Sequence, residues 1–217
     1  MRGRIVAIGG PPGTGKDTLT NAIRQIFSFT TLGTGGVLRD IVRSKASNYI
    51  EIAESQQRGD LTPNYIFLPI FLAELRKWNG TGHDLILNGG LREISHAVTL
   101  AFFLKEKSPS SFPIHYLDFR VGQNESEEEE GLRVCFNRIM NDSNRTDRTD
   151  GADETIRNRF RVFRKNNQPL VQFIRSNPAL FRYHEVNALN TPESVALFVE
   201  SVVEKIGVPF LVPAPCH

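Results

Sequence analysis

Residues 9–18 read Gly-Gly-Pro-Pro-Gly-Thr-Gly-Lys-Asp-Thr and directly follow a short apolar run at residues 5–8. The run predicts a buried strand, and the spacing of Leu19 and Ile23 predicts a helix after the glycines. Strand, glycine loop and helix in this order form the context that a phosphate-binding loop requires. Glycines let backbone N–H groups surround an anion, the helix N-terminus adds positive potential, and Lys16 can reach the terminal phosphates. The stretch therefore predicts a phosphate site within an α/β fold.

Predicted strands and helices also alternate along the rest of the chain. Apolar runs predict strands at residues 84–88, 114–121 and 184–187. Apolar residues at helical spacing predict helices over residues 18–27, 37–42, 94–102, 156–163 and 191–206. We expect Pro169 to stop the fourth of these helices or to restart it. Such alternation is typical of an α/β fold in which helices cover both faces of a parallel sheet.

Two polar stretches lie between these elements. The acidic run at residues 124–130 is predicted to be the solvated start of a helix, because the helix dipole favours carboxylates there. Residues 141–151 are rich in Asn, Asp, Thr and Arg and predict a loop.

Composition indicates a globular protein in a reducing compartment. Of the 217 residues, 40% are hydrophobic and 23% are charged, which argues against a wholly disordered chain. A net charge of +2 gives no reason to expect a nucleic-acid or membrane partner. Cys135 and Cys216 lie far apart and without metal-ligand spacing, which excludes a zinc ribbon. The start of the chain lacks the pattern of a signal peptide, so we expect a cytoplasmic protein.

The spacing Gly-x-Pro-Gly-x-Gly-Lys-x-Thr at residues 10–18 resembles the adenylate kinases and their nucleoside monophosphate kinase relatives. Further landmarks of that family recur in the same order, at residues 34–39, 59–63, 88–92, 138–139, 148–151, 155–159 and 186–188. They read Thr-Gly-Gly-Val-Leu-Arg, Gly-Asp-Leu-Thr-Pro, Asn-Gly-Gly-Leu-Arg, Arg-Ile, Arg-Thr-Asp-Gly, Thr-Ile-Arg-Asn-Arg and Val-Asn-Ala. The resemblance spans roughly residues 5–203, which a chance phosphate loop would not produce.

The resemblance implies a three-layer P-loop NTPase fold with a central parallel sheet, a helical NMP-binding insert and a short lid. It implies one nucleoside monophosphate kinase domain over residues 1–217, with its core at 1–33, 84–138 and 150–207, its insert at about 34–65 and its lid at about 139–149. The lid is short and lacks the cysteines that bind zinc in long-lid bacterial relatives, so no zinc is expected. The family also implies a monomer.

The implied activity is reversible phosphoryl transfer from ATP·Mg²⁺ to a nucleoside monophosphate, with AMP as the expected acceptor. Two nucleotides bring many negative charges into one cleft, so catalysis depends on alignment and on cations, preferably arginines with forked contacts. By resemblance, the cations at the phosphates are Lys16, Arg39, Arg92, Arg138, Arg148 and Arg159. We expect the remaining arginines of residues 157–164 to be solvated: Arg157, Arg161 and Arg164.

The resemblance also implies two binding sets. The ATP-binding set is Gly10, Pro12, Gly13, Thr14, Gly15, Lys16, Asp17, Thr18, Arg138 and Ala188. The NMP-binding set is Thr34, Gly35, Arg39, Leu61, Thr62, Gly89, Arg92 and His96.

Three positions depart from the family pattern. Asn88 replaces the aspartate that organises the waters around Mg²⁺, and Asp17 stands where adenylate kinases usually have glycine. We hypothesise that the carboxylate has moved from position 88 to position 17, so that both residues contact Mg²⁺ through water; alternatively, Asp17 only caps the helix. His96 replaces the glutamine that reads the adenine edge, and it either contacts the acceptor base or is a helix-face histidine.

These departures leave other functions open. The acceptor could instead be UMP, CMP or a deoxynucleotide. A nucleotide-binding module with little catalysis is the alternative from another class, but simple binding would not need six cations.

Overall fold

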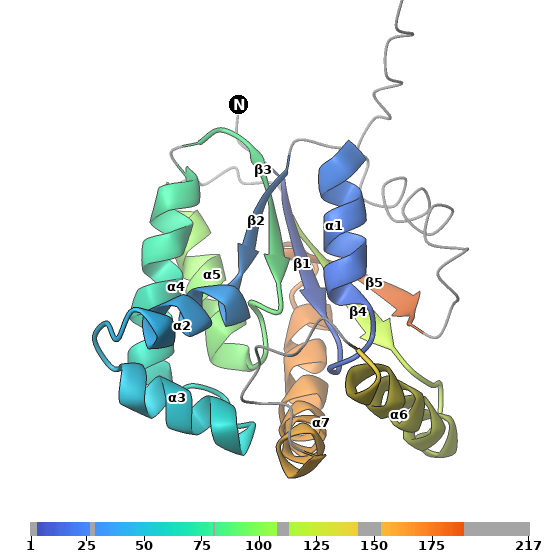
Figure 1. The fold of residues 1–217 in the computed structure, drawn as a ribbon. Coiled ribbons are helices and arrows are strands. Elements are labelled where there is room, and N and C mark those ends of the chain that lie inside the picture. Colours follow the sequence, from blue (N-terminus) through green and yellow to red (C-terminus); the bar gives the residue numbers. More distant parts are fainter. Residues whose placement is uncertain (1–3, 27–28, 80, 108–112, 143–152, 189–217) are drawn as a thin grey trace, which may run out of the picture.

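Five parallel strands form a sheet in the described part of the chain, in the order β2-β3-β1-β4-β5 (Figure 1). The computed structural model describes residues 4–26, 29–79, 81–107, 113–142 and 153–188. The strands are β1 (Ile5–Gly9), β2 (Phe29–Gly33), β3 (Asp84–Asn88), β4 (Ile114–Arg120) and β5 (Phe181–Asn187). All five residues of β1 are buried, as expected for the central strand of a sheet covered on both faces. The predicted α/β fold with a parallel sheet is confirmed.

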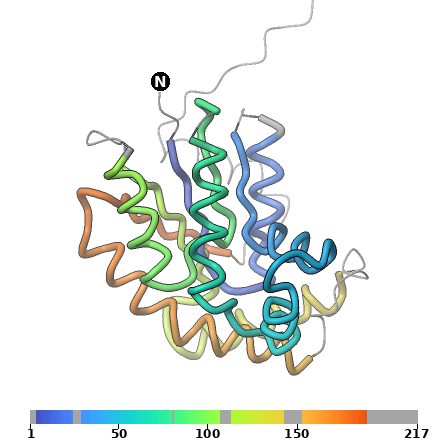
Figure 2. The backbone as a smooth tube through the Cα atoms, turned by 90° about the vertical axis from the view of Figure 1, so that its left-hand side faces the viewer, coloured from blue at the N-terminus to red at the C-terminus, as the bar shows by residue number. Residues whose placement is uncertain are grey.

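Helices cover the two faces of the sheet. On one face, α1 (Lys16–Ile26) and α6 (Glu125–Met140) form a core with Val6, Ile8 and their neighbours on other strands. On the other face, α4 (Asn64–Asn79), α5 (Ile94–Lys107) and the second half of α7 (Asp153–Arg175) follow one another across the sheet (Figure 2). Successive side chains of β1 point to opposite faces of the sheet, so Val6 and Ile8 belong to the first core and Ile5 and Ala7 to the second.

Two further helices, α2 (Thr34–Arg43) and α3 (Tyr49–Arg58), pack against each other beyond the C-terminal end of β2 (Figure 1). Because β1, β3 and β4 run parallel to β2, their carboxyl ends lie at the same edge of the sheet. The loops at this edge are where α/β proteins place ligand sites.

The helix that begins at Asp153 continues past Pro169 to Arg175, so the expectation that Pro169 stops or restarts it is wrong. A proline inside a helix costs about 3 kcal/mol, because it removes one hydrogen bond and crowds the preceding turn. Leu170 and Ile174 follow it and are buried in the second core. Their burial offsets that cost, and Pro169 itself is exposed.

Three elements have no counterpart among the strands and helices predicted from the residue pattern: β2, α3 and α4, although α3 lies within the helical insert that the resemblance implies. β2 contains two threonines and only two large apolar residues, Phe29 and Leu32, and its pairing with β3 makes it a strand. The apolar residues of α4 are too dense to leave one clear stripe, since Ile66, Phe67 and Phe71 are all buried. β5 is also longer than predicted, because it begins at Phe181.

Several predictions fall on residues outside the described ranges. They are the helix over residues 191–206, Arg148 and most of the lid at about 139–149. The limits of the domain, the insert and the lid therefore stay predictions. Among the described helices, none combines the length and the apolar composition that crossing a bilayer requires.

Candidate active site

A cavity of about 730 Å³ opens at the carboxyl edge of the sheet. Its walls come from the loop after β1, the start of α1, the α2–α3 region, the end of β3, α6 and α7. Of the residues predicted from the sequence, all except Thr34 and Arg148 line it. Thr34 is buried behind the wall, where its hydroxyl donates a hydrogen bond to the Gly89 carbonyl over 3.1 Å. Arg148 lies outside the described residues.

The glycine loop wraps around the start of α1. Gly13 has a φ of +80°, and a Cβ atom there would lie 2.4 Å from the Cys135 carbonyl oxygen, so only glycine fits. Lys16 Nζ donates to the carbonyl oxygens of Gly10 and Pro11, over 3.0 and 2.5 Å. Thr14 Oγ1 also donates to the Pro11 carbonyl, over 2.9 Å. The loop thereby places its lysine and the first N–H groups of α1 at the cavity.

Three arginines from separate parts of the chain converge in the cavity. A Cβ atom at Gly35 would lie 3.3 Å from Arg39 Nη1 and 4.0 Å from Arg92 Nη2. Arg92 Nε donates to the Gly89 carbonyl over 2.9 Å. Arg92 is accessible to solvent through the cavity that it lines. Dense protein nevertheless surrounds its guanidinium, and this desolvation is the main reason that the Arg92 pKa is lowered to about 10. The nearby charges of Arg159 and Arg39 act in the same direction. Arg92 stays charged at neutral pH, and such a cluster favours a multiply charged anion.

Asp17 and Asn88 both line the cavity and contact each other. Asn88 Nδ2, at the end of β3, donates a hydrogen bond to Asp17 Oδ1 in the first turn of α1, over 2.6 Å. The two positions that depart from the family pattern are therefore direct neighbours. The Asp17 carboxylate also opposes the lowering of the Arg92 pKa. Asp17 thus brings negative charge to the end of β3, where Asn88 itself has none.

His96 is only 2% exposed, and its two ring nitrogens bind other parts of the protein. The Arg92 backbone N–H donates to Nδ1 over 3.3 Å, so the proton lies on Nε2, which donates to Asn64 Oδ1 over 3.1 Å. The ring also packs against Phe67, with 4.2 Å between ring centroids. Burial, with a smaller contribution from Arg92, lowers the His96 pKa to about 4 against the opposing effect of Glu93. His96 is therefore neutral at pH 7.

Arg138 and Ala188 lie together at another part of the cavity. Arg138 Nη1 donates to the Ala188 carbonyl over 3.1 Å, which joins the end of α6 to the residue after β5. The solvated arginines are also as predicted: Arg157, Arg161 and Arg164 are exposed and hydrogen-bond to Asp153, Asn158 and Glu128, respectively.

The cavity also contains residues that the sequence did not single out. Gln56 and Asp60 line it from the end of α3 and the turn that follows, and Phe67 lines it from α4. Phe163 lies one helical turn after Arg159 and lines the cavity with it. The four-residue spacing from Arg159 could have identified Phe163. Gln56 and Phe67 come from helices that the sequence pattern did not predict.

Comparison with known proteins agrees with this geometry. A sequence model of the adenylate kinase family matches residues 8–178. An adenylate kinase of Thermus thermophilus is 30% identical over 193 residues, which cover 89% of this chain and 93% of that protein. Those of Trichodesmium erythraeum and Archaeoglobus fulgidus are 28% and 25% identical over 202 and 219 residues, and each match covers 91% of this chain and 96% of the relative.

The family match begins at the end of β1 and covers the glycine loop, the arginine cluster and all of α7, so fold, cavity and relatives agree. The chain therefore belongs to the adenylate kinase family and is a phosphotransferase that moves a phosphoryl group between ATP and a nucleoside monophosphate.

Proposed function

We propose that this chain catalyses the reversible reaction of ATP with AMP to give two molecules of ADP. The observation that supports it most is the convergence of Arg39, Arg92 and Arg159 on one cavity that also contains Lys16 and Arg138. Transfer between two nucleotides needs cations on the donor phosphates, on the acceptor phosphate and on the phosphoryl group in between. Binding of one nucleotide alone would not require cations from so many elements.

We assign the donor and acceptor to opposite ends of the cavity. The glycine loop at residues 10–18 and Lys16 would bind the ATP phosphates, and Arg138 with Ala188 would lie beside the donor base. Arg39 and Arg92 would bind the acceptor phosphate, because their guanidinium groups approach each other at Gly35. The acceptor base would lie among Gly35, Leu61, Thr62, Gly89 and His96. Arg148 is assigned to the phosphates from the sequence alone.

Asp17 and Asn88 fit a magnesium ion held through water. Mg²⁺ prefers oxygen ligands, keeps several waters, and is usually bound by one or two carboxylates together with substrate phosphates. The Asp17 carboxylate and the Asn88 amide supply oxygens beside the glycine loop, where the phosphates would lie. When bound, the ion would supply positive charge to the transferred group, and Asp17 and Asn88 would orient its waters.

The proposal is tested with a panel of nucleoside monophosphates, each supplied with ATP and Mg²⁺ and assayed for its diphosphate. We expect AMP to give ADP with the highest kcat/KM. A higher kcat/KM for UMP, CMP or a deoxynucleotide would keep the reaction and change the acceptor. Nucleotide binding without any diphosphate product would contradict the proposal and identify a binding module.

The geometry of His96 leads to a separate prediction about specificity. Because both ring nitrogens bind Arg92 and Asn64, we expect His96 to support the acceptor site without reading the base. Loss of these hydrogen bonds in His96→Ala is expected to lower kcat/KM about tenfold for every acceptor and to leave their ranking unchanged. His96→Asn, whose amide oxygen can replace Nδ1, is the matched variant and should recover part of the activity. A changed ranking of acceptors would show that His96 does read the base.

We further propose that the enzyme acts in the cytoplasm as a monomer. The buried Cys135 thiol is free, and the net charge is small. The free thiol is compatible with a reducing compartment, and the small net charge gives no reason to expect an anionic partner. Analytical ultracentrifugation of the purified chain tests the monomer directly.

A further inference from the structure

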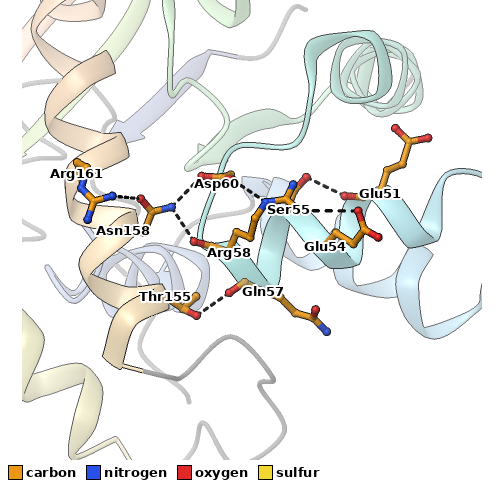
Figure 3. Close-up of polar contacts among 9 residues, drawn as sticks. All are labelled: Glu51, Glu54, Ser55, Gln57, Arg58, Asp60, Thr155, Asn158 and Arg161. Atoms are coloured by element: carbon orange, nitrogen blue, oxygen red, sulfur yellow. Dashed lines mark hydrogen bonds and ion pairs between the residues drawn. The ribbon is translucent and has the colours of Figure 1, made fainter.

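The first turns of α7 are hydrogen-bonded to the end of α3 and the turn that follows it (Figure 3). Thr155 Oγ1 donates to the Gln57 carbonyl over 2.6 Å. Asn158 Nδ2 donates to two acceptors, the Arg58 carbonyl over 2.7 Å and Asp60 Oδ1 over 2.8 Å. About one hundred residues of sequence separate the partners, so the contact exists only in the folded chain.

The backbone at this contact is packed as closely as glycine allows. Gly59 has a φ of +76°, and a Cβ atom there would lie 2.3 Å from the Thr155 carbonyl oxygen. The same atom would lie 3.1 Å from Arg159 Cγ. The turn after α3 is therefore in contact with the first turn of α7, and the Arg159 side chain passes beside it.

The polar groups at the contact orient one another. Arg161 Nη1 donates to Asn158 Oδ1 over 3.0 Å, which directs Nδ2 of the same amide toward its two acceptors (Figure 3). Arg58 Nε donates to Asp60 Oδ2 over 3.0 Å. The hydrogen bonds from Arg58 and Asn158 lower the pKa of the Asp60 carboxyl, so Asp60 is a charged acceptor at neutral pH. An amide at position 158 can donate to both groups, whereas a carboxylate or an alkyl group cannot.

Residues that line the cavity lie on both sides of this contact. Gln56, Gly59 and Asp60 line it from the α3 side, and Arg159 and Phe163 line it from α7. Asn158 thus connects the region assigned to the acceptor with the helix that carries Arg159.

We propose that Asn158 is a positioning residue, which holds the α2–α3 region against α7 so that the acceptor site and Arg159 face each other. This inference rests on the proposed function, because it needs an acceptor in that region. Asn158 acts through the backbone of Arg58 and the carboxylate of Asp60, and it does not line the cavity. Without it, the arrangement that binds the acceptor is populated less, and the apparent acceptor affinity falls by the same fraction. The ATP site at the glycine loop has no contact with Asn158 and is unaffected.

Steady-state kinetics of Asn158→Ala separates this role from a general loss of structure. Two lost hydrogen bonds should raise the acceptor KM about tenfold, while the KM for ATP changes by less than about twofold. Arg157→Ala is the matched control, because Arg157 is exposed, pairs with Asp153 and lies over the Phe136 ring, away from the contact. Arg157→Ala should retain the KM values of the parent for both the acceptor and ATP. An equal rise of both KM values, with a lowered melting temperature, would overturn the proposal.

Thr155 provides a second, isosteric pair of variants. Thr155→Val keeps the shape but loses the hydrogen bond to the Gln57 carbonyl, and Thr155→Ser keeps the hydroxyl. We expect the acceptor KM to rise in Thr155→Val alone, by about threefold for one hydrogen bond. Equal acceptor KM values for the two variants would contradict a role for this contact.

A distance measurement tests the same idea without turnover. Arg43 on α2 and Lys165 on α7 are exposed and can be replaced by cysteine and spin-labelled, with Cys135→Ala and Cys216→Ser in the background. We expect a narrow distance distribution with Asn158 present and a broader, longer one in Asn158→Ala. Identical distributions would overturn the inference even if the parent is an active kinase. A parent that forms no diphosphate would contradict the proposed function, while the distributions would still decide whether Asn158 holds the two regions together.

Discussion

Arg159→Ala is expected to lower kcat about a thousandfold, the size of effect seen when an arginine that stabilises transferring phosphoryl charge is removed. Arg159 lines the cavity and lies close enough to Arg92 to be one cause of its lowered pKa. Arg159 lies on α7 beside the turn after α3, next to the part of the cavity that we assign to the acceptor. If Arg159 contacts the transferred phosphoryl group as we propose, that contact strengthens in the transition state, and we expect kcat to fall far more than either KM rises.

The control for this variant comes from the same helix. Arg164→Ala removes an exposed arginine that hydrogen-bonds to Glu128 and does not line the cavity, so its kcat should match the parent. Arg159→Lys keeps the charge but loses the forked geometry, and it should recover only part of the lost rate. Single-turnover kinetics separates phosphoryl transfer from product release. A kcat for Arg159→Ala within about tenfold of the parent would show that other residues stabilise the charge of the transition state.

Changing either Asp17 or Asn88 alone should produce the second large effect. Asp17→Gly removes the carboxylate at the proposed magnesium position, and we expect a 10- to 100-fold loss of activity, about the size seen when a group that orients a metal's ligands is removed. Asn88→Asp alone should also be impaired. It replaces the hydrogen bond to Asp17 with two adjacent carboxylates, which repel each other and favour uptake of a proton.

The double variant distinguishes relocation of the carboxylate from simple helix capping. Asp17→Gly with Asn88→Asp leaves one carboxylate, now at the end of β3, and should recover most of the activity that either single variant loses. Activity is measured against Mg²⁺ concentration, and we expect the single variants to need more Mg²⁺ for half-maximal rate. If Asp17→Gly is as active as the parent, Asp17 only caps α1 and the relocation hypothesis is wrong.

Much of the fold could be predicted from local patterns. β1, the glycine loop and α1 were predictable because their residues lie next to each other in the sequence and each has a strong local preference. The acidic start of α6 was predictable for the same reason, since Asn124 caps the helix and three glutamates follow in its first turn. β2 was not predictable in this way, because its polar threonines form a strand only through pairing with β3.

The composition of the candidate site was predictable to a similar extent, but its contacts were not. Arg39, Arg92 and Arg159 were identified by their place in a family pattern, and the pattern contains no distances. The state of His96 depends on Asn64 and Phe67, which belong to a helix that the sequence pattern did not predict. The hydrogen bond between Asn88 and Asp17 likewise forms only because β1 and β3 are neighbours in the sheet.

The amino-acid sequence by itself determined the parallel α/β class, the phosphate loop with Lys16 and the family, because each depends on residues at short or regular spacing. Only the tertiary structure decided which cations converge, that both His96 nitrogens are engaged, and that Asn158 joins α7 to the turn after α3. The physical reason is that these contacts join residues far apart in the sequence, and their geometry depends on packing across the whole sheet.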